Sequence, residues 1–552
     1  MKIREYRTLL KTLLNADADR DSAFRYYQRI FHNEWALPEG MGLYDYMHKV
    51  TDHSPHDAIL AGVRVLTGNP LKLKVMPALA NVETKAKANE QERVLRWQLI
   101  QANRRRTSRV ENDIALSALL YGAVALNVVD LDWQIAQAKN LKADTRKMEA
   151  AKRYGRFMVN TYNPRDIHVM RSSYGVEWVA LVQNRLASEI AAEWGDGASR
   201  ELRDLAKEGK WVKYVDCMGY DERCVWCEPV EAEGKEIVLF SPADHGLKFM
   251  PWVALMGGLT LEEAEVDKYH PMLYPLFKTG AWETLNILST LAATEAVVQA
   301  FKKDKVVDSS QDVEQDFTDP DGVMRVPPGV TVQQLAKQPL DPAKMEMVDR
   351  LKQNIQRATV PSVLQGGDLP SGVPFAGLNL YTQTAMGALK PPKDLSEQAM
   401  AEMFTLMLLW TYYSDTPMVA RGGLGSREAG AGEVYSIPPE EINPDEIYIQ
   451  VELTPQLPID KMQQVNVATL LKQLGYPNEY ALEDIGVEDP AGAIRSRIGR
   501  VAHADDQLLH LGETHAAKAG QREFHLGPCG RVHRRGVGHR GHFARAVRDG
   551  HV

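Results

Sequence analysis

The chain has 552 residues, of which 44% are hydrophobic and 25% charged, and its formal net charge is −8. It is too long for one compact core, and its composition is that of a globular protein. The acidic balance argues against a nucleic-acid binder of the whole-surface kind, although it leaves room for a local basic patch. Its longest apolar run, 403–410, is too short to cross a bilayer, and the N-terminal stretch lacks a signal-peptide core, so we expect an intracellular protein without a membrane partner.

The first 155 residues predict mainly helices. Apolar residues recur at three-to-four spacing through 1–35, and the motif SPHDAILAGVRVLTGNP predicts a helix over 54–70 followed by a short strand over 71–77. Residues 89–132 predict two helices that run into a strand, with the change at Gly122. The basic cluster in this region favours a solvated helix end over a phosphate site; it comprises Arg104, Arg105, Arg106 and Arg109.

Residues 156–252 change to strands. Alternating apolar residues and Asn/Gly/Pro punctuation predict strands over 156–170, 176–186, 210–220, 223–230 and 235–242. A helical stretch, 187–209, interrupts them. The pattern predicts an α+β domain with an antiparallel sheet.

The central stretch, 269–392, predicts two long helices joined by a polar insert. The first helix covers 269–303 without a break after Pro275 and spans about 50 Å, and the second begins at Asp341-Pro342 and ends before Pro361. A loop of Gly, Pro and Ser then leads into a helix that meets Pro391-Pro392. The apolar stripe of the first helix should pack on that of the second. These stripes are Leu273, Leu276, Phe277, Leu288, Leu291 and Ala292, and Met345, Val348, Leu351 and Ile355.

The remaining segments differ sharply from one another. Residues 395–414 predict a strongly apolar helix that is buried all round or forms a subunit contact, and 421–433 a flexible Gly-rich loop. A strand over 446–455 and a small helical unit over 460–500 follow. The last 52 residues, 501–552, hold eight of the fifteen histidines without a period, so we expect disorder there, or a translated shifted reading frame.

Motifs for chemistry are absent from the sequence. It has no phosphate loop, HExxH, GxSxG or GxGxxG motif, so we expect no enzyme and no cofactor. Cys224 and Cys227 form a lone CxxC that, with Cys217 as a third ligand at most, favours a plain strand over a zinc site. The acidic run in the insert lacks the order of a calcium loop and favours a solvated or partner-facing surface. Scattered histidines in the tail (His525, His533, His539, His542) favour adventitious metal binding only.

The order of these parts resembles the portal proteins of tailed double-stranded DNA bacteriophages. SPHDAILAGVRVLTGNPLKLKVMP, SALLYGAVALNVVDLD and MVNTYNPRDIHVM look like the early helix and strand, the helix–turn–strand segment and the strand–NP.D–strand motif of the portal wing. GLKFMPWVALMGG looks like the passage into the stem, and DRLKQNIQRATVPSVLQGGDLPSGVPFAGLNLYTQTAMGALKPP like the second stem helix, tunnel loop and kinked helix. The resemblance covers about 20–500.

The resemblance implies a portal fold divided in a fixed order. Its parts would be helices and an α+β wing over 1–268, a first stem helix over 269–303, a small clip over 304–340, a second stem helix over 341–360, the tunnel loop, kinked helix and returning wing strand over 361–459, a short crown over 460–500, and the tail 501–552.

The resemblance also implies a role in the virion. Such proteins form a homo-oligomeric ring, usually a 12-mer, at one capsid vertex, assembled in the host cytoplasm. Double-stranded DNA passes through the ring non-specifically. The ring meets the terminase large subunit, head-completion and tail adaptor proteins, and the major capsid and scaffolding proteins.

Candidate residues for these contacts follow from the same resemblance. The tunnel-loop and channel residues are Gln365, Gly366, Gly367, Asp368, Ser371, Gly372, Lys278, Lys302 and Lys303, with Lys305 beside them, the lysines being weighed evenly against simple solvated charges. The partner-binding clip residues are Asp308, Asp312, Glu314, Asp316, Asp319, Asp321 and Arg325. Two alternatives stay open: a packaging-associated nuclease or ATPase, and a scaffold or adaptor that forms no ring.

Overall fold

The structure is a computed structural model, and its chain divides into two compact units, Met1–Pro490 and Ala491–Val552. All described residues belong to the first unit. The predicted helical unit 460–500, apart from residues 472–473, and the tail 501–552 therefore lie outside them. The described residues are 3–38, 49–77, 82–140, 145–173, 175–230, 236–258, 265–300, 304–307, 331–334, 342–359, 375–421, 434–455 and 472–473.

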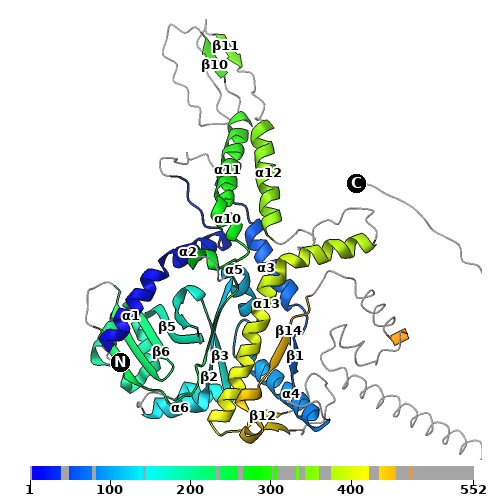
Figure 1. Ribbon diagram of the computed structural model, residues 1–552. Coiled ribbons are helices and arrows are strands. Elements are labelled where there is room, and N and C mark those ends of the chain that lie inside the picture. Colours follow the sequence, from blue (N-terminus) through cyan, green and yellow to red (C-terminus); the bar gives the residue numbers. More distant parts are fainter. Residues whose placement is uncertain are drawn as a thin grey trace, which may run out of the picture. The chain divides into compact units, whose positions relative to one another are not determined.

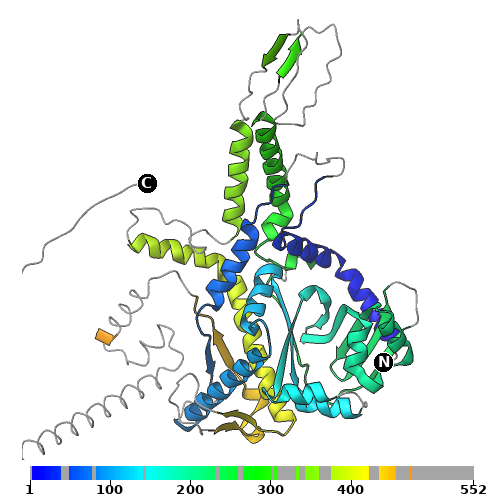
Figure 2. The same cartoon turned by 180° about the vertical axis from the view of Figure 1, so that it is seen from behind.

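Antiparallel sheets form the centre of the first unit (Figures 1 and 2). Five strands pair in the order β4-β5-β6-β7-β8, and three pair in the order β3-β2-β9. Mixed helices and antiparallel sheets confirm the predicted α+β class, and each strand predicted over 156–242 is present. The strands of the two sheets are β2 (Ala123–Asp130), β3 (Phe157–Tyr162), β4 (Ile167–Ser172), β5 (Gly175–Leu186), β6 (Trp211–Gly219), β7 (Glu222–Pro229), β8 (Ile237–Asp244) and β9 (Trp252–Met256), and the strand predicted over 156–170 is divided into β3 and β4.

The segment Asn163–Asp166 carries the chain from one sheet to the other. Because β3 pairs with β2 while β4 pairs with β5, the chain must turn between them. The Asn163 side chain accepts a hydrogen bond from the backbone N–H of Arg165 at 3.1 Å, and Pro164 fixes the start of the 3-10 helix η1 (Pro164–Asp166).

Helices cover both faces of the five-stranded sheet. Successive residues of β5 point to opposite faces, so Trp178 packs against α1 (Ile3–Ala16), whereas Val179 faces the side covered by α8 (Ala187–Trp194) and α9 (Arg200–Lys207). A turn at Asp17 separates α1 from α2 (Ala18–Phe31). The helical prediction over 1–35 is confirmed for α1 and α2. The break at Asp17 was not predicted, and there Asp17 bonds to a distant strand, as described below.

Several of the remaining helices form a second hydrophobic cluster beside the sheets. The α2 helix packs with α3 (Ser54–Thr67) and α5 (Val110–Tyr121). Gly122 ends α5 with a φ of +64°, and an added Cβ would lie 2.9 Å from the backbone nitrogen of Pro271, so only glycine fits this passage. Other elements are α4 (Val82–Arg104), α6 (Leu131–Asn140), α7 (Arg146–Lys152), η2 (Gly195–Gly197), η3 (Glu265–Lys268), η5 (Pro439–Glu441) and η6 (Pro444–Glu446).

The helix α13 (Phe375–Tyr413) contains both the predicted helix that meets Pro391-Pro392 and the predicted helix over 395–414. Pro391 and Pro392 lie inside it, and its two parts run in different directions (Figures 1 and 2), as expected where proline removes a backbone donor and crowds the preceding turn. Its second part is largely buried, as predicted for 395–414, and Trp410 donates a hydrogen bond of 2.7 Å to the carbonyl of Val128 in β2.

Two small sheets close the lower part of the unit. The predicted early and late strands pair with each other, β1 (Lys72–Val75) with β14 (Ile449–Glu452), which brings residues far apart in sequence side by side. A hairpin of β12 (Met418–Arg421) and β13 (Val434–Ile437) follows α13; the predicted loop over 421–433 lies outside the described residues except at Arg421. Within the described ranges, no helix combines the length and the apolar character needed to cross a membrane.

Candidate functional site: the paired helices α11 and α12

The first of the predicted long helices is divided at Gly280. α10 (Tyr274–Thr279) ends where Gly280, at a φ of +60°, donates its N–H to the carbonyl of Leu276 at 2.9 Å. α11 (Ala281–Ala300) then begins at the next residue, and its 20 residues span about 30 Å. The prediction of an unbroken helix over 269–303 was wrong, and Gly280 was the overlooked signal.

α12 (Pro342–Ala358) lies beside α11, and the chain between them contains the antiparallel pair β10 (Asp304–Val307) and β11 (Thr331–Gln334) (Figures 1 and 2). Of the predicted stripes, Leu273, Leu276, Val348 and Ile355 are buried, and Phe277, Leu288, Ala292 and Leu351 are partly buried. Sequence reasoning missed Trp282 and Leu285, which are buried beside them.

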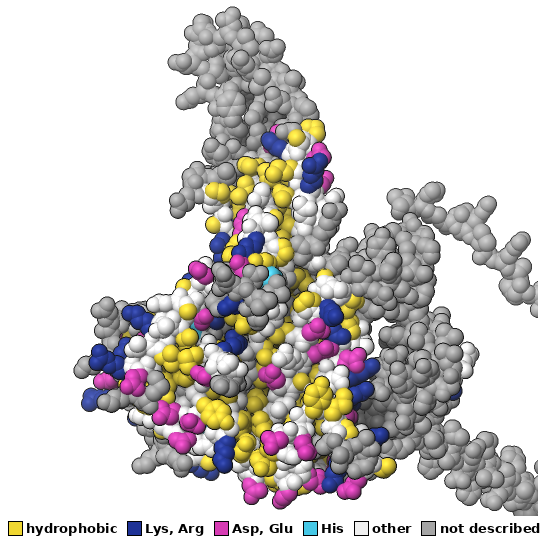
Figure 3. Space-filling model, viewed as in Figure 1, with side chains coloured by type: hydrophobic (Ala, Val, Ile, Leu, Met, Phe, Trp, Pro, Cys, Tyr) yellow, Lys and Arg dark blue, Asp and Glu magenta, His cyan; other side chains and the backbone are white. Residues whose placement is uncertain are grey.

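The far part of the helix pair does not bury its stripe. Leu291 is 38% exposed and Met345 is 44% exposed, contrary to the prediction that both pack inward, and Met347 is 48% exposed. Hydrophobic side chains accordingly lie on the visible face of the two helices (Figure 3). An ion pair between Lys344 and Glu295, at 3.0 Å, joins the helices here, and such an exposed pair contributes at most about 1 kcal/mol.

The near part of α11 is held by a segment from the N-terminal region. Trp282 Nε1 donates to the carbonyl of Asp52 at 2.9 Å, and Asn286 Oδ1 accepts from the Asp52 N–H at 2.8 Å. Thr290 Oγ1 accepts from the Val50 N–H at 3.0 Å. Positions four apart share one helix face, so these three side chains form a row of hydrogen-bonding groups that binds the backbone of residues 50–52. The four-residue spacing of Trp282, Asn286 and Thr290 was the available signal in the sequence.

Of the predicted channel lysines, only Lys278 has a described side chain. Its Nζ lies 2.5 Å from Asp267 Oδ1 and 5.4 Å from the Tyr274 ring centre, and the hydrogen bond to Asp267 raises the pKa of Lys278 above its usual value. Lys278 is therefore an ion-paired residue at the base of the helices rather than a free cation.

The other predicted site residues are not described as side chains. Lys305 lies in β10, where only the backbone is described. The channel residues Lys302, Lys303, Gln365, Gly366, Gly367, Asp368, Ser371 and Gly372, and the clip residues Asp308, Asp312, Glu314, Asp316, Asp319, Asp321 and Arg325, lie outside the described residues.

The basic cluster at the end of α4 is partly structural. Arg105 donates to the carbonyl of Phe157 at 3.2 Å, and Arg106 donates to the carbonyl of Val159 and to Thr161 Oγ1, both at 2.5 Å. These bonds attach α4 to β3, so the solvated helix end predicted here holds for the exposed Arg104 and Arg109 only.

The cysteines lie inside the five-stranded sheet. Cys217 of β6 is the register neighbour of Cys224 of β7, and Cys227 follows on β7; all three are free and buried. Burial raises the pKa of the Cys224 and Cys227 thiols to about 12 each. No group of three or more metal-ligating side chains is found in the described part of the chain, and the strand interpretation of the CxxC motif is confirmed.

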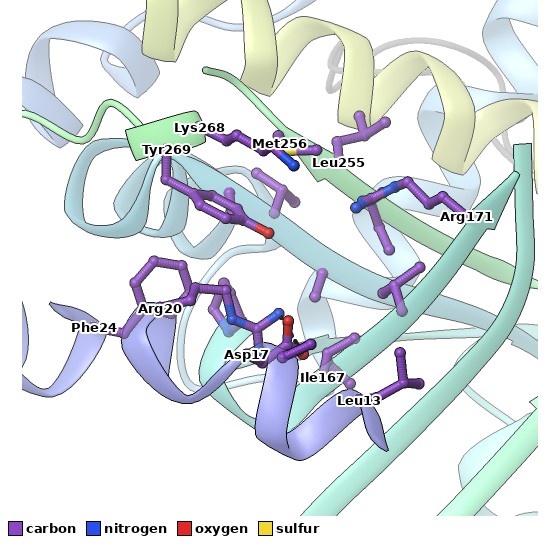
Figure 4. Close-up of a pocket in the computed structure, with 17 residues that line it drawn as sticks. Leu13, Asp17, Arg20, Phe24, Ile167, Arg171, Leu255, Met256, Lys268 and Tyr269 are labelled. Atoms are coloured by element: carbon purple, nitrogen blue, oxygen red, sulfur yellow. Dashed lines mark hydrogen bonds and ion pairs between the residues drawn. The ribbon is translucent and has the colours of Figure 1, made fainter. Parts of the chain in front are cut away.

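A cavity of about 340 Å³ lies between α1–α2 and the three-stranded sheet (Figure 4). Arg20 and Asp17 lie on one side of it, and Tyr269 and Lys268 on the other. Arg20 Nη1 is 3.1 Å from Asp17 Oδ2, and His168 Nδ1 is 2.7 Å from the same oxygen. Burial lowers the pKa of Arg20, but the carboxylates of Asp17 and Asp21 outweigh it and hold the pKa above its usual value. This cluster explains the turn between α1 and α2.

Comparison with known proteins gives structural likenesses but no match to a family model or a curated protein. Among solved structures, this chain is similar to a chain described as "Virion of native gene transfer agent (GTA) particle", with 12% sequence identity and a TM-score of 0.38 over 84% of this chain and 94% of that one.

Proposed function

We propose that the chain is the subunit of a portal ring in a tailed double-stranded DNA bacteriophage, located at the capsid vertex through which the genome enters and leaves. One observation carries the proposal: two helices side by side, α11 and α12, joined through a small β pair and followed by α13, which changes direction at its prolines. This is the order of stem, clip, stem and kinked helix in the family that the sequence resembles.

The physical features of the helix pair suit a conduit. The base of α11 is held by Trp282, Asn286 and Thr290 and by the cluster with α2, α3 and α5, so a wall of about 30 Å stands on a fixed base. On α12, two of the three basic residues whose side chains are described, Lys344 and Arg350, are each paired with a glutamate. Paired cations neutralise few phosphates, so DNA would slide rather than stay bound.

In this proposal the ring has no catalytic step of its own. The segment 304–340 would meet the terminase large subunit and later the head-completion and tail adaptor proteins, and the outer surface would meet capsid and scaffolding proteins. The loop around Gly366 and Gly372 would narrow the channel, because a Gly-rich loop can change conformation while α12 and α13 keep theirs.

Negative-stain electron microscopy of the purified chain tests the proposal. We expect rings with a central hole, and light scattering should give the mass of a closed oligomer. A stable monomer or dimer across concentration would favour an adaptor, and ATP turnover or DNA cleavage by the isolated protein would favour a packaging enzyme; either result contradicts the portal assignment.

The loop assignment has its own test. Deleting residues 366–372 should leave rings intact and impair the packaging or retention of DNA, whereas a deletion of equal length inside the Gly-rich segment 421–433 should impair neither. If packaging survives the first deletion, the placement of the channel loop is wrong while the ring assignment stands.

A further inference from the structure

A second pocket, of about 770 Å³, lies on the surface between α4, the turn from α7 to β3, and the start of β12. Neither the portal proposal nor the helix pair uses it. Its walls are partly apolar, with Trp97 and Ile100 from α4 and Pro417 and Val419 beside them. Ile100 is among the exposed large hydrophobic side chains, as is Tyr154 at the α7–β3 turn. The pocket therefore offers apolar surface to an incoming ligand.

The charged residues that line this pocket are mostly cations. They are Arg104, Lys152, Arg153 and Arg156, against one carboxylate, Asp132. Lys152 is paired with Asp132, and Arg156 with the buried Asp130. Within the described residues, Arg104 and Arg153 form no ion pair; Arg104 donates only to Gln101 Oε1, at 3.3 Å. Two exposed guanidinium groups thus remain for an anionic ligand in a chain whose net charge is −8.

A buried acceptor adds a second requirement. Gln98 lines the pocket and is 2% exposed; its Nε2 donates to the carbonyl of Val419 at 3.1 Å, and its Oε1 has no hydrogen-bond partner among the described residues. An unsatisfied buried acceptor is costly, so this oxygen favours a ligand that brings an N–H donor.

We propose that this pocket binds an acidic peptide segment of a partner protein, with carboxylates on Arg104 and Arg153, a backbone N–H on Gln98 Oε1 and an apolar side chain against Ile100. A peptide combines these three features along one chain. In a nucleic acid the anions lie on the phosphate backbone and the N–H donors on the bases, and no aliphatic side chain accompanies them for Ile100, which disfavours nucleic acid as the occupant. The proposal is independent of the portal assignment.

Fluorescence anisotropy of the full chain tests this site. The probe is a fluorescein-labelled peptide that alternates Glu and Leu, and its counterpart alternates Lys and Leu. We expect the acidic probe alone to bind, and its affinity to fall as salt rises. Replacing Arg104→Glu and Arg153→Glu together should weaken binding at least about tenfold. Arg200→Glu, on the distant α9, makes the same kind of charge change and should leave the affinity unchanged.

A change in the probe, rather than in the protein, tests the role of Gln98. Methylating the backbone nitrogens of the central residues removes their donors, and we expect the affinity to fall about tenfold, whereas methylation at the peptide terminus should have no effect. Hydrogen exchange on the complex should slow amides in 97–104 and 416–419.

Several results would overturn the proposal. They are equal binding of the acidic and basic probes, undiminished binding by the Arg104/Arg153 variant, and no binding at a probe concentration of about 1 mM. Tighter binding of an oligothymidylate that displaces the acidic probe would identify the pocket as a nucleic-acid site instead. Rings seen by microscopy would bear on none of these outcomes.

Discussion

The second part of α13, which packs on the sheet, and the far part of α11 and α12 differ in how many of their polar and apolar side chains are buried. Under α13, polar groups are buried and bonded: Arg156 reaches the buried Asp130 and the carbonyl of Thr416, and Trp410 reaches Val128. On the far part of the helix pair, by contrast, large apolar side chains stay exposed and the ion pairs lie on the surface.

The difference shows that the chain by itself buries the side chains under α13 but leaves those on the far part of α11 and α12 exposed. α12 buries a single stripe, Val348 and Ile355 with Leu351 beside them, and exposes nearly all of its other described side chains. A helix so little covered gains little stability from its own chain. In the proposed ring, neighbouring subunits would cover what α11 and α12 leave exposed.

The largest change in stability is expected at Arg156, whose ion pair with Asp130 is buried. Arg156→Met leaves the Asp130 carboxylate buried without its cation, and we expect a loss of about 3–5 kcal/mol in the free energy of unfolding, measured by urea denaturation. Lys207→Met, which breaks the exposed pair with Asp204, should change it by less than about 0.5 kcal/mol. Adding Asp130→Leu to Arg156→Met should recover part of the loss; no recovery would mean that lost packing, not the charge, causes it.

Two leucines three positions apart on α11 test the boundary between the regions. Leu288→Asp places a charge against the cluster formed with α2, α3 and α5, and should cost about 2–4 kcal/mol or prevent folding. Leu291→Asp should change the subunit's stability by about 0.5 kcal/mol or less, but abolish rings under the microscope. Normal rings from Leu291→Asp would show that no subunit covers this surface.

Much of the fold followed from local sequence patterns. The strands over 156–242 have clear alternation and turn residues, and α12 has a good start at Asp341-Pro342, so both were predicted near their observed ends. The pairing of β1 with β14 was not predicted, because a four-residue strand does not specify a partner so far along the chain. The break at Asp17 likewise depends on His168, a tertiary contact.

The candidate site was less predictable than the fold. Helical period identified Val348 and Ile355, but it does not reveal where a partner helix stops covering a stripe, and Met345 and Leu291 were assigned inward on period alone. The bonds from Trp282, Asn286 and Thr290 to residues 50–52 join segments remote in sequence. Similarly, nothing local distinguishes Arg105 and Arg106, bound to β3, from the exposed Arg104.

Glycine substitutions sharpen the comparison at the base of the helix pair. Gly280→Ala should cost about 1 kcal/mol or more, because Gly280 has a φ of +60° although open space surrounds it. Gly387 lies inside α13, and a Cβ added there would also meet no atom within 4 Å, so Gly387→Ala should instead stabilise the fold by up to about 1 kcal/mol. Thermal unfolding of the two variants measures both signs. Equal shifts in one direction would contradict the assigned break between α10 and α11.

The smallest effect is expected at the cysteines, because the five-stranded sheet seals them. With the pKa of Cys224 and Cys227 raised from 9.0 to about 12, only about one of these thiols in ten thousand is ionised at pH 8, and iodoacetamide should label neither of them in the folded chain. A Cys529→Ser variant removes the cysteine outside the described residues, and urea should then expose the other three together.

The raised pKa values of Cys224 and Cys227 also determine whether the stability of the fold rises or falls with pH. The folded state keeps these protons while the unfolded state loses them near pH 9, so their contribution to stability is present below that pH and falls as the pH rises towards 12. Denaturation midpoints measured upward from pH 8 should therefore decline, and less steeply in a Cys224→Ala/Cys227→Ala variant. Rapid labelling at pH 8 without urea would mean that this sheet opens as readily as the exposed helices, and the contrast between the two regions would fail.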